Sequence, residues 1–135
     1  MSARKAALVT GSTSGIGLAV ATAFAKAGMD VTLNGLGDAA EIERIRSGLE
    51  RETGVSVRYD GANLMKADAC AGMVENAIAA FGRLDVLVNN AGIQFVSPIE
   101  DFPVEKYDAI IALNLSAAFH TIRAAMRTMK AQRYG

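Results

Sequence analysis

The sequence predicts an α/β protein built on an open, doubly wound parallel sheet. Short apolar runs of strand length alternate with longer segments whose apolar residues recur at helical spacing, and glycines separate many of them. Strict alternation of this kind implies parallel strands joined by right-handed crossovers, with helices on both faces of the sheet. Such sheets bind ligands at the carboxyl ends of their strands, where the strand order reverses. The loops at residues 11–17 and 89–94 are therefore the candidate site.

Four short apolar runs have the length of buried strands. The expected strands are Ala6–Thr10, Val31–Leu33, Val55–Tyr59 and Leu84–Val88. The fourth run is apolar except for Asp85, which predicts burial on both faces and a further parallel neighbour on its open edge. No later segment supplies that neighbour, so we expect the first four strands of a larger sheet.

Four longer segments carry apolar residues at helical spacing. The expected helices are residues 15–28, 38–52, 66–81 and 104–130. Asp38 is placed to cap the second helix, and natural stops for the first three are Gly28, Gly54 and Gly82. The fourth helix is the longest, and its apolar stripe includes Tyr107, Ile111, Leu115, Phe119, Ile122 and Met126.

The 135 residues carry 14 basic and 14 acidic side chains and are 51% hydrophobic. This balance excludes a disordered chain and argues against a dedicated nucleic-acid binder. The single Cys70 excludes an internal disulfide and suits a reducing compartment. No apolar run approaches the roughly 18–20 residues of a membrane helix, and the run after the basic start at residues 1–5 is too short for a signal peptide. We therefore expect a cytoplasmic protein with no nucleic-acid or membrane partner.

The loop after the first strand reads Thr10-Gly-Ser-Thr-Ser-Gly-Ile-Gly17, with glycines in the pattern G-x-x-x-G-x-G. Gly11 lets the chain turn sharply, Gly15 lets the backbone approach a pyrophosphate, and Gly17 lets the helix pack closely on the sheet. The free amides and positive end of the helix would then face the phosphates. A P-loop is excluded, because no Gly-Lys-Ser/Thr ends the segment. The alternative is a Gly/Ser-rich turn before an ordinary helix, and the position between strand and helix favours the nucleotide site.

Two motifs together resemble the short-chain dehydrogenase/reductase family, whose fold is of the Rossmann type. They are Thr10-Gly-x-x-x-Gly-Ile-Gly17 and Asn89-Asn-Ala-Gly92, and Asn114 matches the helix asparagine of the family. The resemblance covers residues 6–135. Four segments are similar to the bacterial members that interconvert 3-hydroxybutyrate and acetoacetate by hydride transfer: residues 33–41, 59–62, 90–94 and 99–103.

The resemblance implies a nicotinamide dinucleotide bound by both loops and by positions after the second and third strands. The implied cofactor-binding residues are Gly11, Thr13, Ser14, Gly15, Ile16, Gly17, Leu36, Asn63, Leu64, Asn90, Ala91, Gly92 and Leu113. NAD is favoured over NADP, because residues 12–14 and 34–38 contain no Arg or Lys for a 2′-phosphate. The usual acidic ribose partner is also missing there, so either Asn34 or backbone groups would substitute, with Leu36 packed against the adenosine. Asn63 stands where the family commonly has an Asp that binds the adenine amino group.

Two further residues are assigned by the resemblance to the substrate side. Gln94 would contact the carboxylate of a small hydroxy-acid or keto-acid substrate, since an amide donates hydrogen bonds to a carboxylate; the alternative is a solvated loop glutamine. Asn114 is counted with the catalytic residues, where it holds a helix kink and a water of the proton relay; the alternative is a buried asparagine bonded to backbone. No metal site is expected, because His120 is the single histidine.

The catalytic base of the family is not found in these residues. Oxidation of a secondary alcohol needs a base, which the family supplies as a Tyr in Tyr-x-x-x-Lys together with a Ser. No Tyr of this sequence is followed by Lys at that spacing. We therefore interpret residues 1–135 as the N-terminal part of a single NAD-binding domain, inactive in this form. The alternative is a non-catalytic nucleotide-binding module. The resembling enzymes are tetramers that pair the long helix between subunits, which favours a homo-oligomer.

Overall fold

The structure is a computed structural model and describes residues 4–135, which include Arg4 and Lys5 of the basic start. Its four strands form one sheet in the order β3-β2-β1-β4, and all neighbouring pairs are parallel. The parallel sheet that the alternation predicted is therefore confirmed. The strands are β1 (Ala6–Val9), β2 (Asp30–Asn34), β3 (Val57–Asp60) and β4 (Val86–Val88).

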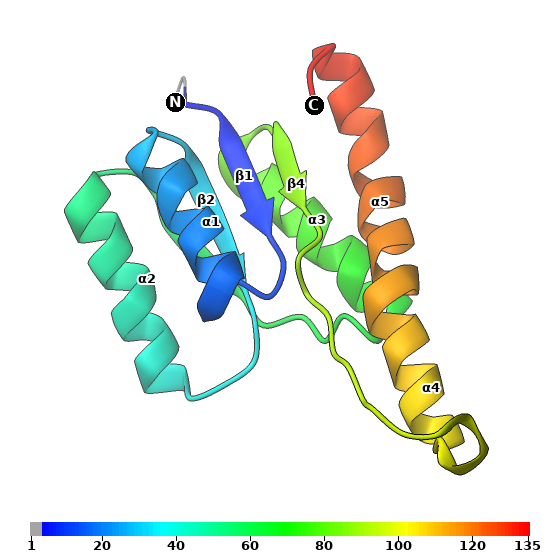
Figure 1. Cartoon of the computed structure of the whole chain (residues 1–135). Helices are drawn as coiled ribbons and strands as arrows, with labels where there is room; N and C mark the ends of the chain where they lie inside the picture. Colours follow the sequence, from blue (N-terminus) through cyan, green and yellow to red (C-terminus); the bar gives the residue numbers. More distant parts are fainter. Residues whose placement is uncertain (1–3) are drawn as a thin grey trace.

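Helices cover both faces of this sheet (Figure 1). Helices α1 (Gly15–Lys26) and α2 (Ala39–Thr53) lie on one face, where Ala21, Ala25 and Leu49 pack with Val31 and Leu33 of β2. Helices α3 (Ala67–Phe81) and α5 (Ala117–Gln132) lie on the other face, where their side chains pack around Leu8 of β1. The sheet is thus doubly wound, with one apolar core on each face.

The strand order reverses between β1 and β4. The chain adds β2 and β3 on one side of β1, and then returns through α3 to place β4 on the other side. In open sheets the carboxyl ends of two such strands flank the ligand crevice. The loops that follow β1 and β4 meet at this point, as the sequence predicted.

The ends of α2 and α3 have the expected capping residues, whereas the C-cap of α1 lies one residue before the expected Gly28. The Asp38 carboxylate accepts a hydrogen bond of 2.9 Å from the Glu41 backbone N–H and caps α2. Gly54 and Gly82 end α2 and α3 in the left-handed conformation, with φ of 77° and 76°. Glycine adopts this conformation without the steric cost that a Cβ would add.

Two strands begin later than the sequence predicts. β3 starts at Val57 instead of residue 55, and the preceding Ser56 N–H donates to the Asp30 carboxylate. β4 starts at Val86 instead of residue 84. Both backbone groups of Leu84 bond to the side-chain amide of Gln132, at 3.0 Å and 2.7 Å. Side chains thus take the hydrogen bonds that a strand partner would have taken.

The single long helix expected over residues 104–130 is interrupted. It divides into α4 (Val104–Ile111), a π-helical turn labelled η2 (Ala112–Ser116) and α5, after a short 3₁₀ turn labelled η1 (Ile99–Asp101). A π-turn inserts an extra residue into a helix and often marks a functional position. Here the turn contains Asn114, to which the resemblance assigned a helix kink.

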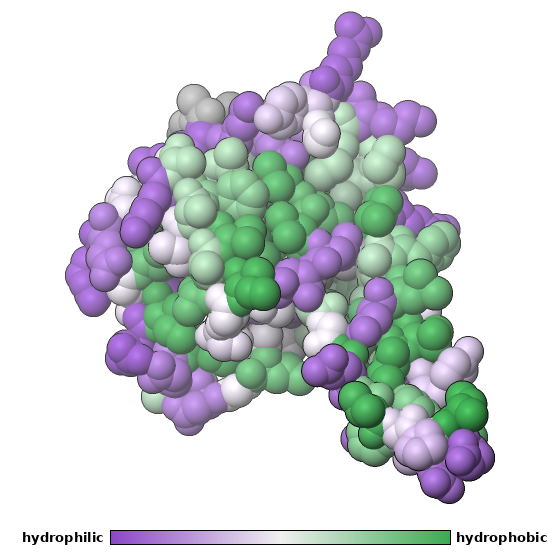
Figure 2. Space-filling view, viewed as in Figure 1, coloured by the Kyte–Doolittle hydropathy of each residue, from purple (hydrophilic) through white to green (hydrophobic). Residues whose placement is uncertain are grey.

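The expected apolar stripe of the long helix faces outward. Tyr107, Leu115 and Phe119 are more than half exposed, whereas the face toward α3 carries the smaller Ala117, Thr121 and Ala125. Figure 2 shows hydrophobic residues along this helix and beside β4. The sequence pattern found the apolar positions, but the small residues allow the close approach to α3 and so decide which face is buried.

Within residues 4–135, the combined helix Val104–Gln132 is the one helix long and apolar enough, by length and composition, to cross a membrane. This is weak evidence of a membrane span, because core helices of soluble proteins pass the same test. The absence of a membrane partner remains a prediction.

Candidate functional site

The glycine loop leaves the start of α1 open to a ligand. Gly11 and Gly15 adopt positive φ angles of 60° and 57°, which turn the chain away from β1 and into the helix. The Ser14 side chain makes no capping hydrogen bond, and the first turn of α1 carries no acidic residue. The backbone N–H groups of this turn are therefore available to an anion, and the helix dipole favours one there.

Gly17 lets α1 pack directly against this loop. A Cβ on Gly17 would lie 2.1 Å from the carbonyl oxygen of Gly11 and 2.6 Å from Nδ2 of Asn90. No real Cβ approaches backbone so closely, so only glycine fits at this position. The expected close packing of the third glycine is present, and its partner is the loop itself.

The loops after β1 and β4 are joined by four hydrogen bonds. Asn90 Nδ2 donates to the carbonyl oxygens of Thr10 and Gly11 at 3.2 Å and 3.0 Å. The backbone N–H groups of Asn90 and Ala91 both donate to Oγ1 of Thr10 at 2.9 Å. The two motifs, far apart in the sequence, therefore form one structural unit at the edge of the sheet.

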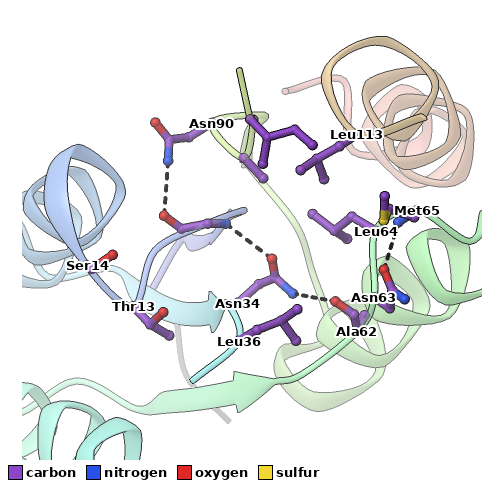
Figure 3. Close-up of a pocket in the computed structure, with 15 residues that line it drawn as sticks. Thr13, Ser14, Asn34, Leu36, Ala62, Asn63, Leu64, Met65, Asn90 and Leu113 are labelled. Atoms are coloured by element: carbon purple, nitrogen blue, oxygen red, sulfur yellow. Dashed lines mark hydrogen bonds between the residues drawn. The ribbon is translucent and has the colours of Figure 1, made fainter. Parts of the chain in front are cut away.

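Asn34 extends this unit to the third loop. Its Oδ1 accepts a hydrogen bond from the Gly11 N–H at 3.2 Å. Its Nδ2 donates to the carbonyl oxygens of Asp60 and Ala62 at 3.0 Å and 3.2 Å. Figure 3 shows the resulting line of hydrogen bonds from Asn90 through the glycine loop and Asn34 to Ala62, beneath an open pocket.

The pocket above this line measures about 520 Å³ and collects residues from four loops and one helix turn. Its lining residues are Gly11, Thr13, Ser14, Asn34, Gly35, Leu36, Ala62, Asn63, Leu64, Met65, Asn90, Ala91, Gly92, Ile93 and Leu113. None of them is ionisable. The pocket can therefore bind a ligand through backbone groups, amides, hydroxyls and apolar contacts, with the helix dipole as its source of positive potential.

Most of the residues that the resemblance assigned to the cofactor line this pocket. Three do not: Gly15, Ile16 and Gly17, which form the first turn of α1 beside it. The Ile16 side chain is 77% exposed, and Gly17 packs against the loop. The pocket adds residues that the sequence did not single out: Gly35, Ala62, Met65 and Ile93. Each of these residues is adjacent in sequence to an assigned residue, and this adjacency is the one signal from which its place in the pocket could have been predicted.

Asn114 binds backbone instead of facing the pocket. Its Oδ1 accepts from the Ile93 N–H and its Nδ2 donates to the Ile93 carbonyl oxygen, both at 2.9 Å. Asn114 is therefore bonded to backbone, as the alternative expected, but it is exposed and not buried. This two-point contact ties the π-turn to the loop after β4. Gln94, the expected substrate contact, is exposed and does not line the pocket.

The remaining chemistry-bearing residues lie outside the pocket. Cys70 is fully buried, its Sγ–H donates to the Leu64 carbonyl oxygen at 3.3 Å, and burial raises the pKa of the thiol. It is therefore an unreactive core residue. Among residues 4–135, no group of three His, Cys, Asp or Glu side chains could hold a metal ion.

A parallel doubly wound sheet with a glycine loop and an uncharged pocket at its switch point defines the class of nucleotide-binding α/β proteins. Residues 5–135 match the family model for short chain dehydrogenase. The chain belongs to the short-chain dehydrogenase family.

Similarity to curated proteins agrees with this family assignment. The chain is 51% identical over 133 residues to a D-beta-hydroxybutyrate dehydrogenase of Cupriavidus necator, covering 97% of this chain and 50% of that protein. It is 48% identical over 131 residues to the enzyme of the same description from Rhizobium meliloti, covering 97% and 51%. The chain therefore spans about half the length of the curated relatives it matches.

Solved structures of similar fold bind both nicotinamide cofactors. A metagenomic short-chain oxidoreductase in complex with NADP superposes with a TM-score of 0.89 at 33% identity, covering 97% of this chain and 59% of the other. An NAD⁺-bound xylitol dehydrogenase superposes with a TM-score of 0.87 at 32% identity, covering 97% and 50%. The family is thus one of oxidoreductases whose members bind either dinucleotide.

Proposed function

We propose that this chain is the cofactor-binding part of an NAD-dependent oxidoreductase that interconverts 3-hydroxybutyrate and acetoacetate. The observation that carries the proposal is the uncharged pocket at the switch point of the sheet, formed by the glycine loop and the Asn90-Ala-Gly92 turn. The identity of about half of the residues to two hydroxybutyrate dehydrogenases supports the substrate.

The residues present fit a dinucleotide. The uncapped first turn of α1 suits a pyrophosphate, since its N–H groups and the helix dipole both favour an anion. Thr13 and Leu36 line the same pocket, and the absence of Arg and Lys from its lining argues for NAD, because a 2′-phosphate needs a cationic partner. Oδ1 of Asn63 accepts a hydrogen bond from the Met65 N–H. Asn63 therefore differs from the aspartate of the family at Nδ2, where the aspartate has a second carboxylate oxygen.

A bound nicotinamide would supply the hydride acceptor, and the chain's own residues would orient it. Gly92 and Ile93 line the pocket next to Leu113, and Asn114 holds Ile93 by both backbone groups. Asn114 is thus proposed as a positioning residue for the loop that carries Gln94. Gln94 is proposed to reach the substrate carboxylate, because the loop after β4 has no regular structure and its amide is free to donate.

The proton-accepting base is proposed to lie outside these residues, since no Tyr-x-x-x-Lys occurs among them. That same observation favours a second candidate, a nucleotide-binding module without turnover. We also propose a cytoplasmic location and a homo-oligomer. The exposed apolar side chains of Leu115, Phe119 and Ile122 support association through the long helix.

The test is calorimetric titration of the purified protein with NAD and NADP, followed by assay of NAD reduction with 3-hydroxybutyrate by the longest natural form of the protein. We expect tighter binding of NAD than of NADP. Tighter NADP binding would overturn the cofactor assignment. Reduction of NAD only with unrelated alcohols would overturn the substrate assignment. Binding without any turnover in the longest natural form of the protein would favour the module.

A further inference from the structure

We propose that Asn34 is a positioning residue of the dinucleotide pocket, which aligns its loops through a buried amide and does not contact the ribose. The inference rests on the proposed function and concerns the one buried polar side chain that lines the pocket floor. Asn34 ends β2 and is 1% exposed. The sequence left open whether Asn34 or backbone groups take the place of the missing acidic ribose partner.

The hydrogen bonds of Asn34 occupy both donors of its amide. Its Nδ2 has two N–H donors, and both are directed to carbonyl oxygens, those of Asp60 and Ala62. Its Oδ1 accepts from the Gly11 N–H. Both donors are therefore used, so Nδ2 could reach a ribose only by leaving a buried carbonyl oxygen unsatisfied, which is costly. Oδ1 keeps a second lone pair, but Asn34 is 1% exposed, so burial shields this lone pair from a ribose hydroxyl.

The main chain of Asn34 is tied to the same loop. Its N–H donates to Oγ of Ser12 at 3.0 Å, and its carbonyl oxygen accepts from the Ser12 N–H at 2.6 Å. Ser12 is fully buried and donates from Oγ to the Val9 carbonyl oxygen at 2.7 Å. Residue 34 therefore holds the glycine loop by main chain and side chain together, and the loop after β3 by side chain alone.

Only an amide satisfies this arrangement. The position needs an acceptor toward Gly11 and two donors toward the carbonyls of Asp60 and Ala62. An aspartate has the same shape but would set a carboxylate against two carbonyl oxygens, and an alanine would leave all three backbone groups unpaired. Asparagine at the end of β2 is thus explained by the loops it joins.

The consequence is that the ribose end of the pocket is formed by the residues that Asn34 positions. Gly35 lies so close to Thr13 that a Cβ on it would stand 2.2 Å from Thr13 Oγ1. Thr13, Gly35 and Leu36 all line the pocket (Figure 3). Their spacing depends on the connection between β2 and the glycine loop, which is the connection that Asn34 makes.

The experiment compares Asn34→Ala with Leu33→Ala in the purified protein. Leu33 is the fully buried neighbour in β2; it belongs to the core of α1 and α2 and does not line the pocket. Thermal unfolding identifies a temperature at which both variants are folded, and calorimetry there measures the affinities for NAD and for NADP. We expect Asn34→Ala to lose about tenfold or more in affinity for both dinucleotides, with their ratio unchanged. Leu33→Ala should be destabilised but should bind as the wild type does.

Each other outcome overturns the proposal in a distinguishable way. A change in the NAD-to-NADP ratio in Asn34→Ala would mean that Asn34 contacts the ribose. Unchanged affinity would mean that Asn34 stabilises the fold only, and equal losses in the two variants would mean that instability causes them. Failure of the wild type to bind either dinucleotide would refute the proposed function and the positioning role with it. If the wild type binds and Asn34→Ala has the same affinities, the positioning role alone is refuted.

Discussion

Gly17 is the position where a single methyl group tests the architecture of the site most directly. In Gly17→Ala the new Cβ would lie 2.1 Å from the Gly11 carbonyl oxygen and 2.8 Å from its carbonyl carbon. To reach an ordinary contact, the glycine loop must move by about 1 Å. The loop cannot move freely, because Asn34 holds the Gly11 N–H and Asn90 holds the Gly11 carbonyl.

The size of the effect follows from two opposing terms. Inserting a methyl group into close-packed structure costs about 1–3 kcal/mol, and replacing a helical glycine by alanine returns about 1 kcal/mol. We expect Gly17→Ala to lose up to about 2 kcal/mol of unfolding free energy. Because the displaced loop must be restored before a dinucleotide can bind, we expect the affinity for NAD to fall about tenfold, which corresponds to about 1.4 kcal/mol.

Urea unfolding and calorimetric titration with NAD measure the two effects. The matched control is Gly72→Ala in α3, where a Cβ would meet nothing within 4 Å. We expect this control to gain up to about 1 kcal/mol of stability and to bind NAD normally. If Gly17→Ala matched the wild type in both stability and affinity, the inference that α1 and the two loops form one rigid unit would be wrong.

Three further predictions concern charge, cofactor choice and helix capping. The Arg83 guanidinium, and then the Ala6 N–H, hold the pKa of Asp85 below its ordinary value. This stabilisation is therefore complete above the ordinary Asp pKa of about 3.9 and is lost as pH falls through the lower folded value. Asp85→Asn should lose about 1–3 kcal/mol at neutral pH and flatten the acid limb of urea-unfolding curves, and an unchanged acid limb would refute the assignment. Leu36→Arg should raise the affinity for NADP relative to NAD about tenfold in calorimetry, because it adds a cation to an uncharged pocket; an unchanged ratio would place the 2′-position elsewhere. Asp38→Ala should cost about 1 kcal/mol in thermal unfolding by removing the cap of α2, with NAD affinity unaffected.

The fold was predictable where the local signals of the sequence agree with the tertiary structure. The capping contact of Asp38 and the left-handed Gly54 and Gly82 act within a few residues of the chain, so their sequence signals suffice. The starts of β3 and β4 were wrong, because Ser56 and Leu84 bond to side chains that lie far away in the sequence. No local pattern carries such a contact.

The candidate site divides in the same way. Glycine positions in the loop after β1 were predictable, because the turn and the start of α1 require them within a few residues. The π-turn at Asn114 was not predictable from spacing, since it depends on the pairing of that side chain with Ile93 in another segment. The exposed position of Gln94 and the outward apolar face of the long helix were likewise decided by how neighbouring elements pack.

The sequence by itself determined the alternation of strands and helices, the glycine loop and the absence of a base for a 2′-phosphate, because these depend on residue type and short-range order. Only the tertiary structure decided that Asn34 faces the loops, that Gly17 packs on Gly11, and that Asn90 joins two distant motifs. The physical reason is that a hydrogen bond or a steric contact between distant residues exists only once the sheet order β3-β2-β1-β4 has brought their loops to one edge.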